Sequence, residues 1–401
     1  MKPERYPIVT LKSVNLTNMF TRTLTICFLL SALSLQAQNA ARLVSPEVLP
    51  DQSVIFRLKS PTAKNVQVVG SWKADKPIPM TRIDSVTYEA KIGPLPTDIY
   101  EYRFNVDGTM TLDPGNGFVT TGGTVVESRV LIPGKLGNLL ATQPVPHGNV
   151  TAVWYPSPTL GATRRMQVYT PPGYEEGKGT YPVLYLLHGA GGDEESWISR
   201  GRANYILDNL IAAKEAVPMI VVITNGNPDV VSSPLNRPLA ESTKDASGPA
   251  GMASLKFEES LVNDVIPYIE KHYRVKADAD HRALTGFSMG GYQTQNISNK
   301  YPNLFKYIGV MSMGLFSSYR NSQPNYDKEK HVAQLKALMA AKPRFYWVGI
   351  GKADFLYDSV TKLRGLYDEV GLPYTYRETP GAHTWNEWRL YLTELAPHYF
   401  K

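Results

Sequence analysis

The chain contains very little cysteine, because Cys27 is the single one among its 401 residues. It also has no long hydrophobic run near its amino terminus, where the mainly apolar 12-residue run Leu24–Leu35 falls short of the roughly 20 residues that a membrane-spanning helix needs. Cys27 lies inside this run, which we expect to be removed. A mature chain without a thiol has no disulfide, no cysteine nucleophile and no cysteine-ligated metal, so serine is the natural nucleophile.

The apolar run has the features of a secretory signal. Arg22 precedes it, and it ends on Leu35-Gln36-Ala37, a small-residue cleavage pattern. We predict a signal peptide over residues 1–37 and a secreted or periplasmic mature protein; an uncleaved membrane anchor is the alternative. The leader is unusually long, so Met19 is an alternative start to Met1.

The chain has no strong excess of charge of either sign, with a formal net charge of +6. The predicted signal holds four basic residues and one acidic residue, which leaves the mature chain near +3. No basic run, internal repeat or low-complexity tract is present, so a nucleic-acid partner is not expected. With 43% hydrophobic and 19% charged residues, the composition is that of an ordinary globular protein long enough for two domains.

The first part of the mature chain alternates apolar and polar residues in short runs that are bounded by Gly, Pro and Asp. The runs are Val54–Leu58, Val66–Val69, Tyr88–Ile92 and Tyr100–Val106. Period-two alternation predicts antiparallel strands, so we expect a small β-sandwich over residues 38–134. A segment without periodicity, 135–147, is the predicted linker.

The remainder, 148–401, alternates strand-like and helix-like segments, which favours a largely parallel sheet covered on both faces. Its near-continuous apolar runs are Tyr181–Leu187, Met219–Thr224, Phe305–Met311 and Arg344–Ile350. One connection, Asn225–Lys256, is much longer than usual and is rich in Gly, Pro, Ser and Asn. Loops of this length are commonly functional, so we expect it to form a wall or lid over the active site, with a solvated excursion as the alternative.

The segment Gly286-Phe287-Ser288-Met289-Gly290 lies where a short strand turns directly into a helix. This is the Gly-x-Ser-x-Gly nucleophile elbow, whose glycines permit a tight turn that exposes the serine hydroxyl. A serine hydroxyl needs a base within hydrogen-bond distance and a third group to orient that base. Ser288 is therefore the candidate nucleophile.

His383 and Asp354 follow Ser288 in the order of the α/β-hydrolase fold: serine, acid, histidine. His383 lies in a Gly-Ala-His turn between a strand-like segment and an aromatic helix, and it could instead be a capping or packing residue. Asp354 comes soon after a buried strand, so its carboxylate should lie at the same sheet edge as the elbow. Asp358 is its competitor, and a helix N-cap is the alternative role for Asp354.

A tetrahedral intermediate needs donors for its oxyanion, which this architecture takes from the amide after the nucleophile and from a loop after an earlier strand. Those amides belong to Met289 and Ala190. Ala190 lies in the loop His188-Gly189-Ala190-Gly191-Gly192, where the glycines allow the backbone N–H groups to turn inward. Only the amide is used, so the side chain at each donor position is unconstrained.

Three segments together resemble one family, the esterase D-like hydrolases, and specifically the feruloyl and acetylxylan esterases of carbohydrate esterase family 1. The segments are Leu186–Trp197, Gly286–Tyr292 and Gly381–Arg389. The resemblance covers roughly residues 145–401 and implies an α/β-hydrolase without metal or cofactor. It also implies Ser288, Asp354 and His383 as the catalytic triad, with Ala190 and Met289 as the oxyanion hole.

The β-sandwich resembles the immunoglobulin-like, glycogen-binding-type module often fused to these esterases, through Val66–Trp72 and Gly93–Phe104. Trp72 is its only tryptophan, so we expect a packing or positioning domain that helps shape the active-site rim.

The resemblance implies a feruloylated or acetylated plant polysaccharide as the partner, and we expect Trp197, Tyr292, Trp385 and Trp388 as aromatic contacts for a feruloyl ring. Aromatic residues at such spacing are more often in the core. We therefore predict a secreted serine esterase that releases ferulate or related hydroxycinnamates from arabinoxylan through an acyl-enzyme. The alternatives are an acetylxylan esterase, an enterochelin-type siderophore esterase, and a carbohydrate-binding protein that has lost activity.

Overall fold

The structure is a computed structural model. It describes residues 43–73, 76–122, 125–233, 255–315 and 326–401. The predicted signal peptide lies outside the described residues, and so does most of the predicted lid, 234–254. In the part of the chain that is described, no helix is both long and apolar enough to cross a membrane.

The first two sheets are antiparallel and lie where alternating runs predict strands. One contains, in spatial order, β1 (Glu47–Val48), β2 (Val54–Lys59), β6 (Thr87–Ile92) and β5 (Thr81–Arg82). The other contains β4 (Ile78–Pro79), β3 (Val66–Gly70), β7 (Asp98–Val106), β10 (Val125–Ile132) and β9 (Val119–Gly122), with β8 (Thr109–Thr111) paired to β7. Inward residues of both, such as Phe56, Val68 and Phe104, form one buried core, consistent with the expected β-sandwich.

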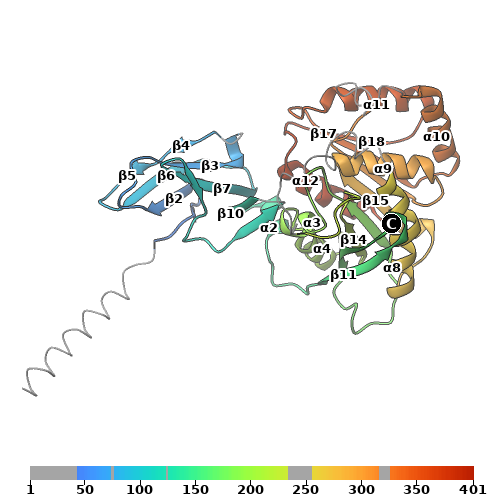
Figure 1. The fold of residues 1–401 in the computed structure, drawn as a ribbon, viewed down its shortest axis with the longest axis horizontal. Helices are drawn as coiled ribbons and strands as arrows, with labels where there is room; N and C mark the ends of the chain where they lie inside the picture. The colour runs from blue at the N-terminus through green and yellow to red at the C-terminus, as the bar shows by residue number, and fades with distance from the viewer. Residues whose placement is uncertain (1–42, 74–75, 123–124, 234–254, 316–325) are drawn as a thin grey trace, which may run out of the picture. The chain divides into compact units, whose positions relative to one another are not determined.

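The third sheet has eight strands (Figure 1). Their spatial order is β11 (Asn149–Ser157), β12 (Ala162–Thr170), β14 (Ile220–Thr224), β13 (Val183–Leu187), β15 (Arg282–Phe287), β16 (Tyr307–Met311), β17 (Phe345–Gly351) and β18 (Thr375–Thr379). The six strands β14, β13, β15, β16, β17 and β18 are parallel to one another. Strand β12 pairs antiparallel with both of its neighbours, β11 and β14. The largely parallel sheet expected from the apolar runs is confirmed.

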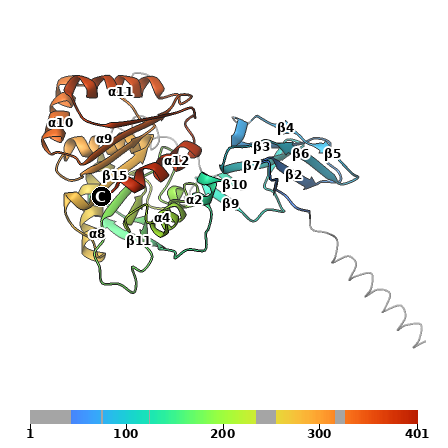
Figure 2. The same ribbon diagram turned by 180° about the vertical axis from the view of Figure 1, so that it is seen from behind.

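Helices cover both faces of this sheet. They are α3 (Ser196–Ser199), α4 (Ala203–Ala212), α7 (Lys256–Ser260), α8 (Ile266–His272), α9 (Met289–Lys300), α10 (Lys328–Ala340), α11 (Tyr357–Val370) and α12 (Trp385–Leu395). One core packs α7 to α11 against the sheet, and a second core packs α3, α4 and α12 against it. Helices α4 and α12 lie side by side (Figure 2). Burial on both faces explains why the strands read as continuous apolar runs.

The predicted linker contains regular structure, the short helix α2 (Lys135–Leu140). Leu140 is fully buried in the same core as α4 and α12, and Asn209 on α4 donates to the carbonyl of Leu139. Residues Ser45–Lys401 accordingly form one compact unit. A six-residue helix with one buried leucine is too short to show a helical period, so its sequence is not distinguishable from a linker.

A buried ion pair joins helix α12 to strand β7 of the β-sandwich. Arg389, whose side chain is fully buried, lies 2.9 Å from Asp98 and 3.3 Å from Glu101. Asn386, one turn earlier, donates to Asp98 as well, at 2.7 Å. Because buried charges are tolerated only when they are paired and hydrogen-bonded, these contacts fix the start of α12, next to His383, against the β-sandwich.

Candidate active site

Ser288 lies at the sharp turn between β15 and α9, with a φ of 53° and a ψ of −118°. A positive φ is strained for a residue with a Cβ, and here the surrounding backbone enforces it. Gly286 and Gly290 permit the turn, because a Cβ on either would clash with a neighbouring backbone carbonyl. The amide of Ser288 donates to the carbonyl of Met311 on β16, 3.0 Å away.

The structure brings Ser288, His383 and Asp354 together. His383 Nε2 lies 2.9 Å from Ser288 Oγ, and His383 Nδ1 lies 2.8 Å from Asp354 Oδ2. An ionised carboxylate only accepts, so Nδ1 carries the proton and Nε2 is left to accept from the serine hydroxyl. This arrangement can remove the hydroxyl proton as Ser288 attacks a carbonyl carbon.

Asp354, rather than its competitor Asp358, is the carboxylate at His383. The Asp354 side chain is fully buried after β17, and its second oxygen, Oδ1, accepts from the amide of Leu356 at 2.9 Å. Asp358 lies in the first turn of α11 and is exposed. The carboxylate of Asp354 is thus held from both sides.

Ala190 and its glycine neighbours line the cavity at Ser288. Met289 is the first residue of α9, so its amide is among those that have no partner within the helix. The loop is tightly turned, with a φ of +76° at Gly191 and a bond from the Gly192 amide to the Gly189 carbonyl. The two predicted donor amides therefore come from segments that meet at Ser288.

His188, which begins this loop, is fully buried and fixes the position of the loop. Its Nδ1 lies 2.8 Å from the carbonyl of Gly189, and its Nε2 accepts from the amide of Gly226 at 2.8 Å. Gln293 on α9 donates to the carbonyl of the same Gly226. The sequence shows only that His188 belongs to the loop; this bracing role depends on the distant Gly226.

The pKa of His188 is lowered by burial, which disfavours its charged form. Below its ordinary value of 6.5 the unfolded chain takes up a proton that the buried ring does not, so acidification destabilises the folded protein. The unfolding free energy of the parent should therefore fall as the pH is lowered below 6.5. In His188→Gln, which cannot take up this proton, we expect that fall to be smaller by up to about 1.4 kcal/mol per pH unit.

Urea unfolding of parent and variant between about pH 7.5 and 5.5 measures this difference. His331, whose pKa is also lowered by burial, remains in both proteins and cancels in the comparison. Equal slopes would contradict the assignment of this pH dependence to His188.

Of the four predicted aromatic contacts, the structure places Trp385 and Trp388 at the cavity. Trp197 is fully buried, and its indole N–H donates to the carbonyl of Leu187 at 3.0 Å, which allows the burial. Tyr292 is also buried, in the core under α9. Neither lines the cavity, in contrast to the expectation.

Two further aromatic residues, Phe287 and Phe355, lie at the site as well. Trp388 and Phe287 stack with centroids 3.8 Å apart, and both line the cavity. Phe355 is 59% exposed, and its ring lies 4.5 Å from that of His383. A phenylalanine directly after the predicted acid Asp354 is the sequence signal that could have identified the contact from Phe355.

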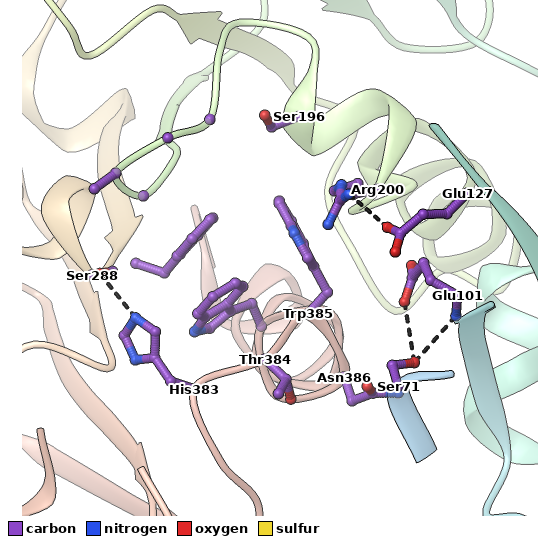
Figure 3. A pocket seen from close by; sticks show the side chains of 16 residues that line it. Ser71, Glu101, Glu127, Ser196, Arg200, Ser288, His383, Thr384, Trp385 and Asn386 are labelled. Atoms are coloured by element: carbon purple, nitrogen blue, oxygen red, sulfur yellow. Dashed lines mark hydrogen bonds and ion pairs between the residues drawn. The ribbon is translucent and has the colours of Figure 1, made fainter. Parts of the chain in front are cut away.

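The cavity has a volume of about 450 Å³, within the usual range for small-molecule sites. Figure 3 shows Ser288 and His383 at one end and the Arg200–Glu127 pair at the other, with Trp385 between them. Ser71, Glu101 and Glu127 come from the β-sandwich. Within the described ranges, no group of three or more His, Cys, Asp and Glu side chains is arranged to hold a metal ion.

The chain is similar to known esterases. A family model named Esterase matches residues 157–399, more than half of the chain. An endo-1,4-beta-xylanase/feruloyl esterase of Xylanibacter ruminicola is 34% identical over 270 residues, which cover 65% of this chain and 35% of that protein. The chain spans about a third of the length of the first curated relatives it matches.

Two solved structures are similar in fold. A ferulic acid esterase is 27% identical with a TM-score of 0.51, over 63% of this chain and 98% of its own. The enterochelin esterase of Shigella flexneri is 16% identical with a TM-score of 0.62, over 91% of this chain and 97% of its own, a likeness of fold alone. The predicted α/β-hydrolase fold and the resemblance to feruloyl esterases are confirmed, and the chain belongs to the Esterase family.

Proposed function

We propose that the protein is a serine carboxylic-ester hydrolase that releases ferulate or related hydroxycinnamates from plant cell-wall arabinoxylan. The observation that carries the proposal is the hydrogen-bonded chain Ser288–His383–Asp354 at a strained elbow that opens into a cavity. The choice of acyl group is supported by the 34% identical relative whose name includes feruloyl esterase, and by aromatic side chains beside the serine.

In the proposed mechanism, Ser288 Oγ attacks the ester carbonyl carbon while His383 Nε2 takes the hydroxyl proton. His383 then gives that proton to the departing sugar oxygen, which leaves an acyl-enzyme on Ser288. Water, deprotonated by the same imidazole, attacks the acyl carbon. The bond from this carbon to Ser288 Oγ then breaks, the imidazole returns the proton to Oγ, and the free acid leaves. Asp354 holds the imidazole in the required tautomer throughout.

The negative charge that develops on the carbonyl oxygen in both steps requires fixed donors. We propose the amides of Ala190 and Met289 for this role, and the N-terminus of α9 adds a favourable dipole. The serine and these amides supply the chemistry, so the proposal includes no metal or cofactor.

We further propose that the mature protein begins at Gln38, is secreted or periplasmic, and acts on feruloylated or acetylated polysaccharide or oligosaccharide. The apolar run before Gln38 supports export. The proposed domains are the β-sandwich, 38–134, the connecting segment, 135–147, and the hydrolase domain, 148–401, a division supported by three separate sheets.

A siderophore esterase of the enterochelin type is the second candidate. The observation that favours it is the likeness in fold to the enterochelin esterase over 91% of this chain, which spans the β-sandwich as well as the hydrolase domain. Both candidates cleave esters whose acyl part carries an aromatic ring, so the aromatic cavity is compatible with each.

Assays of methyl ferulate, acetylated xylan and enterochelin under identical conditions separate the candidates. We expect the highest kcat/KM on methyl ferulate, because the flat ring can pack against Trp385 and Trp388 while an acetyl group leaves the cavity unfilled. Release of ferulate no faster than release of the other two acyl groups would remove the hydroxycinnamate proposal and leave a serine esterase of another specificity.

A further inference from the structure

The catalytic cavity has a polar end that the β-sandwich helps to build. Ser288 and His383 lie at one end, and the Arg200–Glu127 pair lies at the other (Figure 3). Trp385 lies between them, and Phe287 and Trp388 line the cavity too. A substrate that fills the cavity from Ser288 therefore has an apolar, flat part beside these rings and a polar group beyond them.

Two carboxylates lie at the polar end, and they differ in what they can offer a ligand. Glu101 is committed to the protein, since its Oε1 lies 3.3 Å from Arg389 and 3.6 Å from Arg129, both fully buried, and its Oε2 lies 3.4 Å from Ser71. Glu101 is therefore a structural residue that holds the β-sandwich and α12 together.

Glu127 and Arg200 remain accessible from the cavity. Glu127 Oε2 lies 2.7 Å from Arg200 Nη2, and the two side chains are 18% and 20% exposed. Glu127 Oε1 lies 4.0 Å from Arg103, beyond hydrogen-bond distance. The pair thus presents a carboxylate acceptor and a guanidinium donor, which a hydroxyl group can satisfy at once.

The position of this pair is fixed before a ligand binds. Glu127 and Arg129 lie two residues apart on β10 and so share one face of the strand. Arg129 donates to the carbonyls of Ser199 at 2.6 Å and of Arg200 at 2.9 Å, and Arg389 also donates to the carbonyl of Arg200. Buried bonds from two elements therefore hold the Arg200 backbone against β10, as a specificity site requires.

From this arrangement we propose that Glu127 and Arg200 bind the ring hydroxyl of the acyl group, which makes the β-sandwich part of the specificity site. The inference rests on the proposed function. The aromatic ring of a 4-hydroxycinnamoyl group attached at Ser288 packs beside Trp385, and its phenol donates to Glu127 while accepting from Arg200. A substrate without that hydroxyl offers neither Glu127 nor Arg200 a hydrogen-bond partner.

The test compares methyl 4-hydroxycinnamate with methyl cinnamate, which lacks only the hydroxyl. We expect the parent to prefer the hydroxylated ester in kcat/KM. In Glu127→Gln and Arg200→Met this preference should fall about 10-fold, because each variant removes one charged hydrogen-bond partner of the phenol. The fall should come from a lower kcat/KM on the hydroxylated ester, with kcat/KM on methyl cinnamate unchanged. Two variants are used so that one that fails to fold, as judged by its melting temperature, leaves the other.

The matched control is Glu89→Gln, which removes a similar ion pair in the same domain. Glu89 lies 2.7 Å from Arg57, and both residues belong to the four-stranded sheet, none of whose residues lines the cavity. Its preference should equal that of the parent. The inference is overturned if the folded Glu127→Gln and Arg200→Met variants keep the parent's preference for methyl 4-hydroxycinnamate over methyl cinnamate. It is also overturned if the variants lose this preference only when the two acids are esterified to arabinose, since the pair would then contact the sugar. A parent that hydrolyses neither methyl 4-hydroxycinnamate nor methyl cinnamate overturns the proposed function as well, so the two failures are distinguishable.

Discussion

Ser288→Ala should lower kcat/KM on methyl ferulate by about 10⁴-fold or more while leaving the melting temperature close to that of the parent. The reason is chemical: the variant has no oxygen to form the acyl-enzyme. The fold itself loses the 2.9 Å hydrogen bond between Ser288 Oγ and His383 Nε2. Residual activity comes from substrate binding and from the oxyanion donors, which the substitution does not touch.

Steady-state kinetics and thermal unfolding of parent and variant measure both effects. The alanine also relieves no strain, since residue 288 still needs a positive φ, and so a large rise in stability is not expected. A variant that keeps a tenth or more of the parent's turnover would show that another group attacks the ester.

Asp354→Asn should reduce kcat by about 10⁴-fold. Oδ1 of residue 354 accepts from the amide of Leu356, and an asparagine can keep that bond only by turning its NH₂ group toward His383 Nδ1. Two donors cannot face each other, so His383 would shift its proton to Nε2 and could no longer accept from Ser288.

Asp358→Asn is the matched control, because this aspartate lies only four residues away but is exposed on α11. We expect its kcat to stay within about twofold of the parent, as for surface substitutions. Equal losses in the two variants, measured with the same ester, would contradict the assignment of the third triad position to Asp354.

The parts of this fold that the sequence predicts are those with a local signal. Strands buried on both faces, such as β13 and β14, have continuous apolar runs. The elbow needs particular residue types at fixed spacing, and chain order then points to Asp354 and His383. The strand and elbow signals lie within a few residues of the features that they predict, whereas chain order links residues that are far apart in the sequence.

The rest depends on which distant segments meet. Trp197 and Trp385 are both tryptophans near motif residues, yet one is fully buried and the other lines the cavity, because only the tertiary structure gives Trp197 a partner in the Leu187 carbonyl. Glu127 lies on an alternating strand and reads as a solvent-facing residue. Its contact with Arg200 joins residues 73 positions apart, and no local pattern encodes that distance.

The most direct test of the central claim, that Ser288 is a nucleophile activated in place by His383, is to map the adduct of a fluorophosphonate probe by peptide mass spectrometry. The account predicts a single adduct on the peptide that contains Ser288, and none in Ser288→Ala. A parent that takes up no probe, as expected of a carbohydrate-binding protein without activity, or that carries the adduct on another residue, would contradict it.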